Sequence, residues 1–156
     1  MNIRKMEETD INYVYELIEK NLDGIMSEYH SKNVIEMFKN HNNPDSLRNQ
    51  MKWKEIFVIE NGKEIIATGA LANFGSNDLP KYSISNFYIK LEYHFKGIGK
   101  KLFSHLLDLA KTKNVSTLHV PSSRNAIRFY EKMGFTEEEI QNDSKDEITC
   151  MTMNLP

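Results

Sequence analysis

The sequence predicts an α/β protein in which helices cover a mixed β-sheet. Short β-rich runs and helical stretches alternate, in the order strand, two helices, three strands, helix, strand, helix and one or two further strands. The dipeptide Asn61-Gly62 separates two of the β-rich runs, as in a β-hairpin. The chain has 156 residues, of which 40% are hydrophobic and 27% charged, and this composition suits one folded domain over residues 1–156.

Charge and cysteine content exclude several broad classes of protein. Twenty Lys and Arg residues against 22 Asp and Glu residues give a net charge of −2, which disfavours a binder of nucleic acid or of anionic membranes. Cys150 is the only cysteine, and the His residues show no metal-ligand spacing, so we expect neither a disulfide nor a metal site. Neither a signal peptide nor a run of 18 apolar residues is recognisable, and we therefore expect a cytoplasmic protein.

The N-terminal third contains one expected strand and two expected helices. The strand covers Ile3 to Met6, and the first helix covers about residues 10 to 20, with Asp10 or the preceding threonine as its N-cap. Residues 21–32 have weak periodicity and are expected to form a loop. A short second helix over 34–38 is expected to end at the following H-N-N-P sequence.

Three consecutive strands are expected in the middle of the chain. Residues 55–60 and 64–71 are β-rich and flank Asn61-Gly62, a pair that favours a type I′ turn with positive φ at both residues. Residues 82–89 alternate polar and apolar side chains and form the third expected strand. Neither face of this strand is cleanly apolar.

The C-terminal part contains the most amphipathic helix of the chain. Apolar side chains recur at helical spacing after the glycines at 97 and 99, and again before Gly134, which suits the left-handed position after a helix end. Ser122 or Ser123 can cap the second of these helices. The expected elements are a helix over 97–114, a strand over 115–120, a helix over 126–133 and a last strand over 147–155.

One candidate binding motif is H-F-K-G-I-G-K at residues 94–100, between an expected strand and an expected helix. A helix N-terminus offers unpaired N–H groups and a partial positive charge, and glycines let a phosphate approach the backbone closely. The motif lacks the spacing of a P-loop and the third glycine of the dinucleotide fingerprint. Taken alone, it is more typical of an ordinary helix start.

A second motif, S-S-R-N-A-I-R-F-Y-E-K-M-G-F at residues 122–135, makes a binding role for residues 94–100 the better interpretation. Together the two motifs resemble those of the GNAT superfamily of N-acetyltransferases, and the order of elements agrees over essentially the whole chain. The resemblance implies a mixed, mostly antiparallel central sheet flanked by about four helices. It also implies that acetyl-CoA is the acetyl donor and that no metal is needed.

The resemblance assigns roles to individual residues. By this resemblance, the backbone of the expected strand over 82–89 would hold the pantetheine arm at Phe87, Tyr88 and Ile89. Asn125 would contact the cofactor, and Tyr130 would be the general acid for the departing thiolate. The glycine loop would hold the pyrophosphate and consists of His94, Phe95, Lys96, Gly97, Ile98, Gly99 and Lys100. Two residues depart from the family pattern: His94 stands where Gln or Arg is usual, and Phe95 where a small residue is common.

The residue that removes the proton from the acceptor amine is not identified by the motifs. An alkylammonium with a pKa near 10.4 is only about one part in 10³ neutral at pH 7, which costs roughly 4–5 kcal/mol unless the site takes up the proton. Many members of the GNAT superfamily carry Glu or His on the strand that corresponds to residues 82–89, but Ser83 and Ser85 occupy these positions here. Glu28 and His30 are the candidate bases, although a solvent-exposed position is more typical of each. Tyr29 and His30 are the expected acceptor-site residues.

Two functions remain in view. The first is an N-acetyltransferase that moves an acetyl group from acetyl-CoA to a primary amine by direct attack in a ternary complex. The second is a non-catalytic acyl-CoA-binding regulatory module of the same fold. A small-molecule amine or a peptide could be the acceptor, and a homodimer is kept open. Trp53 between Lys52 and Lys54 could form the lip of a ligand site, but that pattern is more typical of an element boundary.

Overall fold

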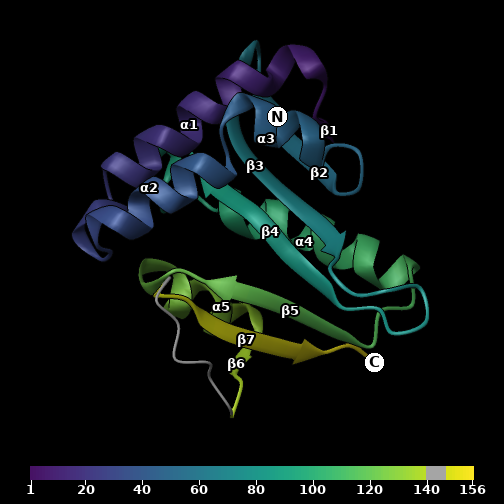
Figure 1. Ribbon diagram of the computed structural model, residues 1–156. Helices are drawn as coiled ribbons and strands as arrows, with labels where there is room; N and C mark the ends of the chain where they lie inside the picture. Colours follow the sequence, from purple (N-terminus) through teal and green to yellow (C-terminus); the bar gives the residue numbers. More distant parts are fainter. Residues whose placement is uncertain (140–146) are drawn as a thin grey trace.

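A seven-stranded sheet forms the centre of the computed structural model, which describes residues 1–139 and 147–156. Its strand order is β1-β2-β3-β4-β5-β7-β6 (Figure 1). The strands are β1 (Asn2–Lys5), β2 (Glu55–Asn61), β3 (Glu64–Asn73), β4 (Tyr82–Ile89), β5 (Thr117–Ser122), β6 (Thr136–Glu137) and β7 (Thr149–Asn154). Every neighbouring pair is antiparallel except β4 and β5, which are parallel. The predicted mixed, mostly antiparallel sheet is therefore confirmed.

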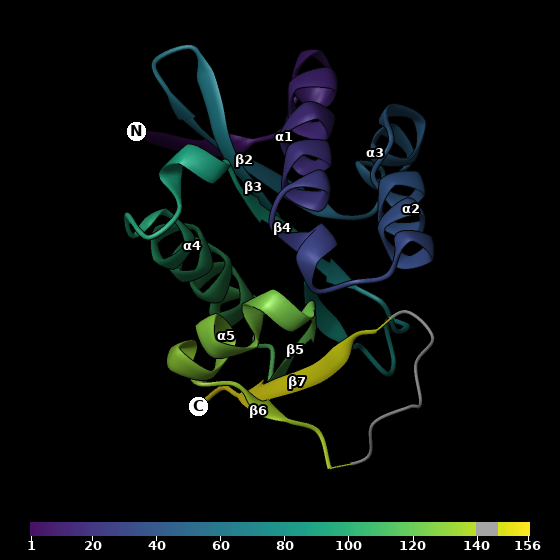
Figure 2. The same ribbon diagram turned by 90° about the vertical axis from the view of Figure 1, so that its left-hand side faces the viewer.

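Helices cover both faces of the sheet. The α-helices of the described chain are α1 (Ile11–Asp23), α2 (Lys32–His41), α3 (Pro44–Gln50), α4 (Ile98–Thr112) and α5 (Ile127–Met133). Short 3₁₀ helices are η1 (Glu8–Asp10), η2 (Met26–Glu28), η3 (Leu91–Tyr93) and η4 (Arg124–Ala126). Figure 2 shows α1, α2 and α3 on one side of β3 and β4, with α4 on the other side.

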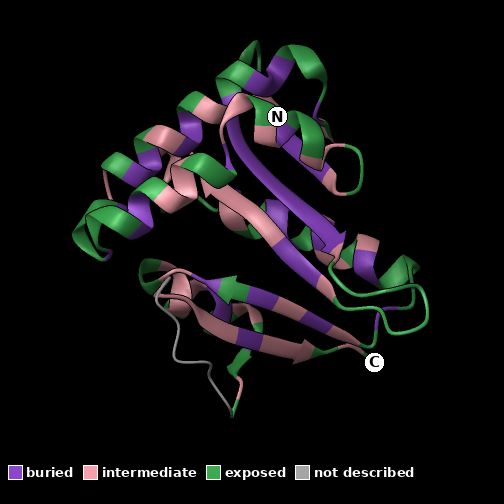
Figure 3. Ribbon diagram, viewed as in Figure 1, coloured by how far each residue is buried: buried purple, intermediate pink, exposed green. Residues whose placement is uncertain are grey.

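Two apolar clusters fill the space between the sheet and these helices. On one face, Leu102 and Leu106 of α4 pack against strand residues such as Ile59. On the other face, Ile18 of α1 and Leu47 of α3 pack against the opposite side chains of β2. Figure 3 shows that β3, in the middle of this half of the sheet, is buried along most of its length. Burial on both faces explains why β2 and β3 are apolar without a clear alternation.

The sheet parts between β4 and β5. Within the described chain, Ser83 and His119 form the one pair that joins these two strands. Beyond Ser83 the strands diverge, and Figure 1 shows the gap widening towards the end of β4. Part of one edge of β4 is therefore left without a strand partner in the middle of the sheet.

A β-bulge in β4 explains why neither face of this strand has a clean apolar pattern. Thr68 of β3 pairs with Tyr88 and Ala70 pairs with Ser85, so β4 has an extra residue between these pairs. Asn86, which lies in the extra segment, has a φ of +52°. The extra residue reverses the alternation of sides, so Ile84 and Phe87 both contact the α4 side of the core.

The hairpin between β2 and β3 is confirmed, but the prediction of its turn type is wrong. Asn61 pairs with Glu64, which leaves Gly62 and Lys63 as the two loop residues. Gly62 has a positive φ, of +64°, whereas Asn61 and Lys63 do not. Glycine at the first central position is typical of a type II′ turn, which matches strand twist as well as type I′ does.

The structure adds a helix that the sequence pattern does not predict. Asn42 ends α2 as expected, but Asn43 then caps α3 by accepting a hydrogen bond from the Ser46 backbone N–H at 2.8 Å. Pro44 occupies the first turn of α3, where its missing N–H costs nothing. The same Asn-Pro sequence thus ends one helix and begins the next. The first helix also runs further than expected, to Asp23.

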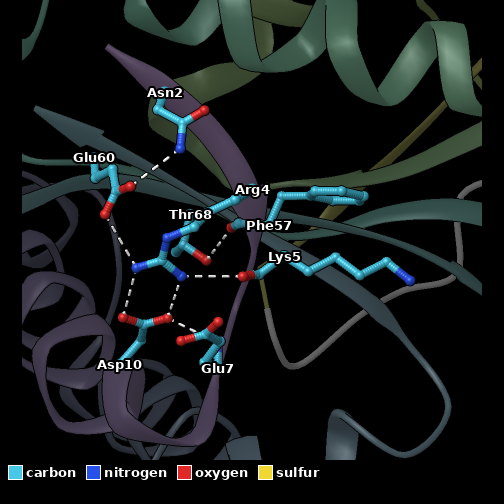
Figure 4. Close-up of polar contacts among 8 residues, drawn as sticks. All are labelled: Asn2, Arg4, Lys5, Glu7, Asp10, Phe57, Glu60 and Thr68. Atoms are coloured by element: carbon cyan, nitrogen blue, oxygen red, sulfur yellow. Dashed lines mark hydrogen bonds and ion pairs between the residues drawn. The ribbon is translucent and has the colours of Figure 1, made fainter.

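Arg4 joins β1 to the start of α1 and to β2. Its guanidinium donates hydrogen bonds to both carboxylate oxygens of Asp10, at 2.7 and 3.0 Å, and to Glu60 at 3.2 Å (Figure 4). Asp10 also accepts from the Glu7 backbone N–H at 2.7 Å. The Asp10 side chain is expected to cap α1, but it forms no capping hydrogen bond with this helix. It fixes the turn before the helix instead.

The C-terminal elements follow the expected order. Gly134 ends α5 with a φ of +111°, which confirms the predicted left-handed position. Ser123 precedes η4 without a side-chain capping hydrogen bond, and the Ser122 hydroxyl donates to the Ser123 carbonyl oxygen, so the predicted serine cap is not formed. The last strand begins at Thr149, two residues later than expected.

Candidate functional site

A cavity of about 1440 Å³ extends along β4 and into the gap where β4 and β5 part. Its walls come from α1, η2, α2 and α3 on one side and from α4, η4 and α5 on the other. The two motifs of the sequence, 94–100 and 122–135, both contribute to the lining. Residues far apart in the sequence therefore meet around one volume that is large enough for an extended ligand.

The glycine loop forms the N-terminus of α4 at one end of this cavity. Gly97 precedes the helix with a φ of +81°, a conformation that side chains other than glycine rarely adopt. A Cβ atom built on Gly97 would meet nothing within 4 Å, so the backbone there faces open space. Ile98, Gly99 and Lys100 follow in the first turn and also line the cavity. Their N–H groups have no partner within an α-helix, which makes this turn suitable for binding a phosphate.

Gly99 has a second role, in packing. A Cβ atom at this position would lie 3.1 Å from the ring of Phe129 in α5. Phe129 in turn lies against Phe87 of β4, with 5.6 Å between the ring centres. Glycine at this position therefore lets α4, α5 and β4 approach one another beside the cavity.

The loop before α4 differs from the expected arrangement in part. His94 lines the cavity, but its Nε2 atom donates to the Ile89 carbonyl oxygen at 2.7 Å. Phe95 also lines the cavity and is fully exposed, with a φ of +61°. A left-handed conformation at this position explains why a small residue is common there in the family that the sequence resembles. Lys96 lies outside the cavity lining and stacks over Tyr93 at 5.6 Å.

The end of β4 supplies the residues expected beside the pantetheine arm. Phe87, Tyr88 and Ile89 all line the cavity. The Ile89 carbonyl oxygen also accepts a hydrogen bond from the side chain of Asn21 in α1 at 2.8 Å. This bond and the one from His94 fix the end of β4 between α1 and the glycine loop.

Tyr130 lies deep in the cavity wall, on α5. It is buried, and its ring contacts those of Phe129 and Phe135 at 5.2 and 5.6 Å between ring centres. Burial, with a smaller effect of the nearby Tyr88 hydroxyl, raises the pKa of Tyr130 above its ordinary value. The phenol therefore keeps its proton at neutral pH and can donate it.

The remaining predicted residues divide into those that line the cavity and one that does not. Asn125 of η4, Tyr29 and Glu28 all line it. His30 does not, because its side chain is fully buried elsewhere. Its Nε2 atom accepts from the Arg124 backbone N–H at 3.2 Å, and its Nδ1 atom lies 3.3 Å from Glu147. His30 thus joins the segment after η2 to η4 and to the segment just before β7.

A polar cluster at the bulge of β4 has no counterpart among the predicted site residues. Lys54 Nζ donates to the Ser85 hydroxyl at 2.9 Å and to Asn86 Oδ1 at 3.1 Å. The Asn86 amide donates to Asn42 and Gln50, each at 2.9 Å. All five of these side chains line the cavity. They hold the positive φ of Asn86 in place and bring one partly buried ammonium group into the α2–α3 side of the cavity.

Weak signals for this cluster exist in the sequence. Asparagine is depleted in strands, so Asn86 within a β-rich run is typical of a bulge. Lys54 stands beside Trp53, a pattern typical of an element boundary. The boundary is real, since β2 begins at Glu55, but Trp53 and Lys54 also line the cavity. The place of Lys54 in this lining depends on its contacts with β4, which local sequence does not reveal.

Two further findings concern the described residues as a whole. In residues 1–139 and 147–156, no three His, Cys, Asp or Glu side chains lie together in a way that could hold a metal ion. Within the same ranges, no helix is both long enough and apolar enough to cross a membrane.

Solved structures share this fold at low sequence identity. The PaiA N-acetyltransferase of Thermoplasma acidophilum, in complex with coenzyme A, is 21% identical, with 99% of this chain and 98% of that chain covered and a TM-score of 0.82. A GCN5-related N-acetyltransferase of Rhodopseudomonas palustris is 16% identical, with 99% and 95% covered and a TM-score of 0.83. N-acetylglutamate synthase of Neisseria gonorrhoeae, with coenzyme A and N-acetyl-glutamate, is 18% identical over 99% of this chain and 35% of that chain, with a TM-score of 0.75.

Two sequence comparisons bear on the family of this protein. A sequence comparison with curated proteins found no match. The model described as "Acetyltransferase (GNAT) domain" matches residues 25–156, which include both motifs and the whole cavity-lining part of β4. Because this match spans most of the chain and the fold agrees with it, the protein belongs to the GNAT acetyltransferase family.

Proposed function

We propose that this protein is an N-acetyltransferase that moves an acetyl group from acetyl-CoA to a primary amine by direct attack in a ternary complex. The observation that carries the proposal is that the α4 N-terminus, the end of β4 and Tyr130 all line one cavity. The donor would occupy the β4–α4 side of this cavity. The acceptor would enter from the side formed by η2, α2 and α3.

The glycine loop fits the pyrophosphate of the donor. Gly97 leaves open space where any side chain would project, and the following N–H groups carry the positive end of the α4 dipole. Lys100, exposed in the first turn, adds a positive charge at the same end. Coenzyme A is present in two of the structures that share this fold.

Acetyl-CoA would supply the acetyl group as a thioester, and the chain would position it and complete the proton transfers. Backbone N–H groups beside the parted strands can polarise the carbonyl. Tyr130 would then donate a proton as negative charge develops on sulfur. Its raised pKa keeps the proton in place until that step.

Among the described residues, the acceptor amine has few nearby proton acceptors. Ser83 and Ser85 are not bases, and His30 is outside the cavity lining. Glu28 lines the cavity from η2 and stays a candidate, as does a chain of water molecules. The acceptor is either a small-molecule amine or a peptide, and a homodimer remains compatible with the site.

A panel of amines with acetyl-CoA tests this function. Released thiol and the mass of the product are measured together for alkylamines, amino acids, aminoglycosides and peptides with a free N-terminus. We expect thiol release above the rate of hydrolysis for at least one class, with a matching acetylated product. Acetyl-CoA at one hundred times its Kd should also stabilise the fold by about 2.7 kcal/mol, a rise in Tm of several degrees.

The regulatory alternative gives a different result in the same experiment. A non-catalytic acyl-CoA-binding module would show the rise in Tm without acetylated product for any amine. If neither acetyl-CoA nor free CoA changes the Tm at millimolar concentration, both functions are contradicted.

A further inference from the structure

Lys54 places a positive charge on the acceptor side of the cavity. The residue lies between α3 and β2, is partly buried, and reaches the bulge of β4 through Ser85 and Asn86. Its Nζ atom also lies 5.0 Å from the ring centre of Trp53 and 5.1 Å from that of Phe74. Both rings line the cavity, are half-exposed and contact each other edge to face at 5.2 Å between ring centres, so the ammonium group lies beside an aromatic pair in the cavity wall.

This charge has no anionic partner in the described part of the chain. No carboxylate of residues 1–139 or 147–156 forms an ion pair with Lys54, and burial lowers its pKa to about 8. At that pKa about nine-tenths of the side chains still carry the charge at pH 7. Burying a charge without a partner is costly. The two aromatic rings and two neutral oxygens offset only part of this cost.

The hydrogen bonds of the cluster leave room for one more acceptor. An ammonium group has three N–H donors, and Ser85 and Asn86 supply two acceptors. The neighbouring amides are already engaged, because Asn86 donates to Asn42 and Gln50. A single remaining donor and a single positive charge suit one carboxylate oxygen. A phosphate group would need several donors.

We propose that the acceptor is an amine that also carries a carboxylate, and that Lys54 binds this carboxylate on the cavity side of the Trp53 and Phe74 rings. This inference rests on the proposed acetyl transfer and names the substrate class for it. The carboxylate would supply both the third hydrogen-bond acceptor and the missing negative charge. A polyamine would place a second cation beside Lys54 and is disfavoured by repulsion.

Matched pairs of acceptors test this inference. Each pair consists of an ω-amino carboxylate with one to five methylene groups and the carboxamide of the same length. The two members of a pair differ in the charge of the group opposite the amine. The chain length that gives the highest kcat/KM reports the distance between Lys54 and the acetyl group. The ratio of kcat/KM for carboxylate over carboxamide is measured in the wild type and in Lys54→Met, Lys54→Gln and Lys54→Arg.

We expect the wild type to prefer the carboxylate at least tenfold at the best length, since a hydrogen bond between two charged groups is stronger than one to a neutral amide. Lys54→Met and Lys54→Gln should reduce the preference to within about twofold, mainly through a higher KM. Lys54→Arg keeps the charge and should retain most of the preference. Lys52→Met serves as the control, because Lys52 is exposed and lies outside the cavity lining.

Two results would overturn the inference while leaving acetyl transfer intact. One is a wild type that uses the carboxamide as well as the carboxylate at every length. The other is an equal loss for both members of each pair in all three Lys54 variants, which is the behaviour of a general base. Failure of the proposed function itself is recognised separately, as no thiol release with any amine and no rise in Tm with acetyl-CoA. In folded Lys54 variants that rise should equal that of the wild type.

Discussion

Tyr130 joins the core and the chemistry in one side chain. Its ring packs among Phe87, Phe129 and Phe135, while the residue also lines the cavity. Tyr130→Phe removes the hydroxyl oxygen and keeps this packing. If the phenol donates a proton to the departing thiolate, kcat should fall about 10²–10⁴-fold.

The measurement for this variant is a single-turnover acetylation rate beside the acetyl-CoA thermal shift, which should stay nearly intact. Tyr13→Phe is the control, since Tyr13 is exposed on α1 and outside the cavity lining. A wild-type single-turnover rate in Tyr130→Phe would leave Tyr130 with a packing role alone.

The Arg4–Asp10 pair makes a residue-scale prediction about stability. Hydrogen bonds from Arg4 lower the pKa of Asp10, so the folded state favours its ionised form. A lowered folded-state pKa gives stability that is present above the unfolded-state pKa near 4 and is lost as the pH falls below it. Asp10→Asn should therefore cost about 1–3 kcal/mol at pH 7 and progressively less below pH 4.

Chemical unfolding of both proteins at several pH values measures this difference. Asp45→Asn is a suitable control, because Asp45 also pairs with an arginine but is almost fully exposed. A stability difference for Asp10→Asn that does not shrink in acid would contradict the assignment to its charge.

Single residues differ in how far local sequence predicts them. Gly134 and Tyr130 lie within a motif whose spacing defines their helix, and the structure places both on α5 or at its end. Lys54 looks like a boundary residue in the sequence because its partners, Ser85 and Asn86, are 31 and 32 positions away. Contacts between residues so far apart in the sequence leave no pattern in the residues around Lys54.

At the scale of an element, the N-terminus of α4 is the part of the site most open to a test. Gly97→Asn places a side chain in the open space before the helix, and asparagine tolerates the left-handed conformation better than other residues do. Most of the acetyl-CoA thermal shift should be lost. Gly62→Asn is matched to it, because Gly62 also has a positive φ and open space where a Cβ atom would project, but lies in a hairpin outside the cavity lining.

Gly62→Asn should keep the full acetyl-CoA shift. A Gly97→Asn variant that binds acetyl-CoA as tightly as Gly62→Asn would mean that the glycine loop only starts a helix. Gly99 is less suitable for this comparison, since a Cβ there would press on Phe129 and change packing as well as binding.

Elements are predictable where a local pattern decides them. The α4 helix is expected over 97–114 and runs over Ile98–Thr112, because its apolar stripe and its glycine start are both local. The helix α3 is not expected, since the short sequence Asn42-Asn43-Pro44 ends one helix and begins another. The bulge of β4 depends on hydrogen bonds with Asn42, Gln50 and Lys54, which only the folded chain brings together.

For the molecule as a whole, the parting of β4 and β5 is what joins the two motifs into one site. The Ser83–His119 pair holds the strands together at one end, and the cavity fills the gap beyond it. The helices α1, α2 and α3 form one wall and α4 with α5 the other. Donor and acceptor can therefore approach the same point from opposite sides of the sheet.

Hydrogen exchange with and without acetyl-CoA tests this account most directly. Donor bound along β4 and the α4 N-terminus should slow amide exchange in peptides that cover 84–89 and 97–101, because those N–H groups gain partners or lose contact with water. Peptides that cover 55–61, in β2, should exchange at the same rate in both samples. If acetyl-CoA raises the Tm but leaves exchange at 84–89 and 97–101 unchanged, the donor binds elsewhere and the central claim is contradicted.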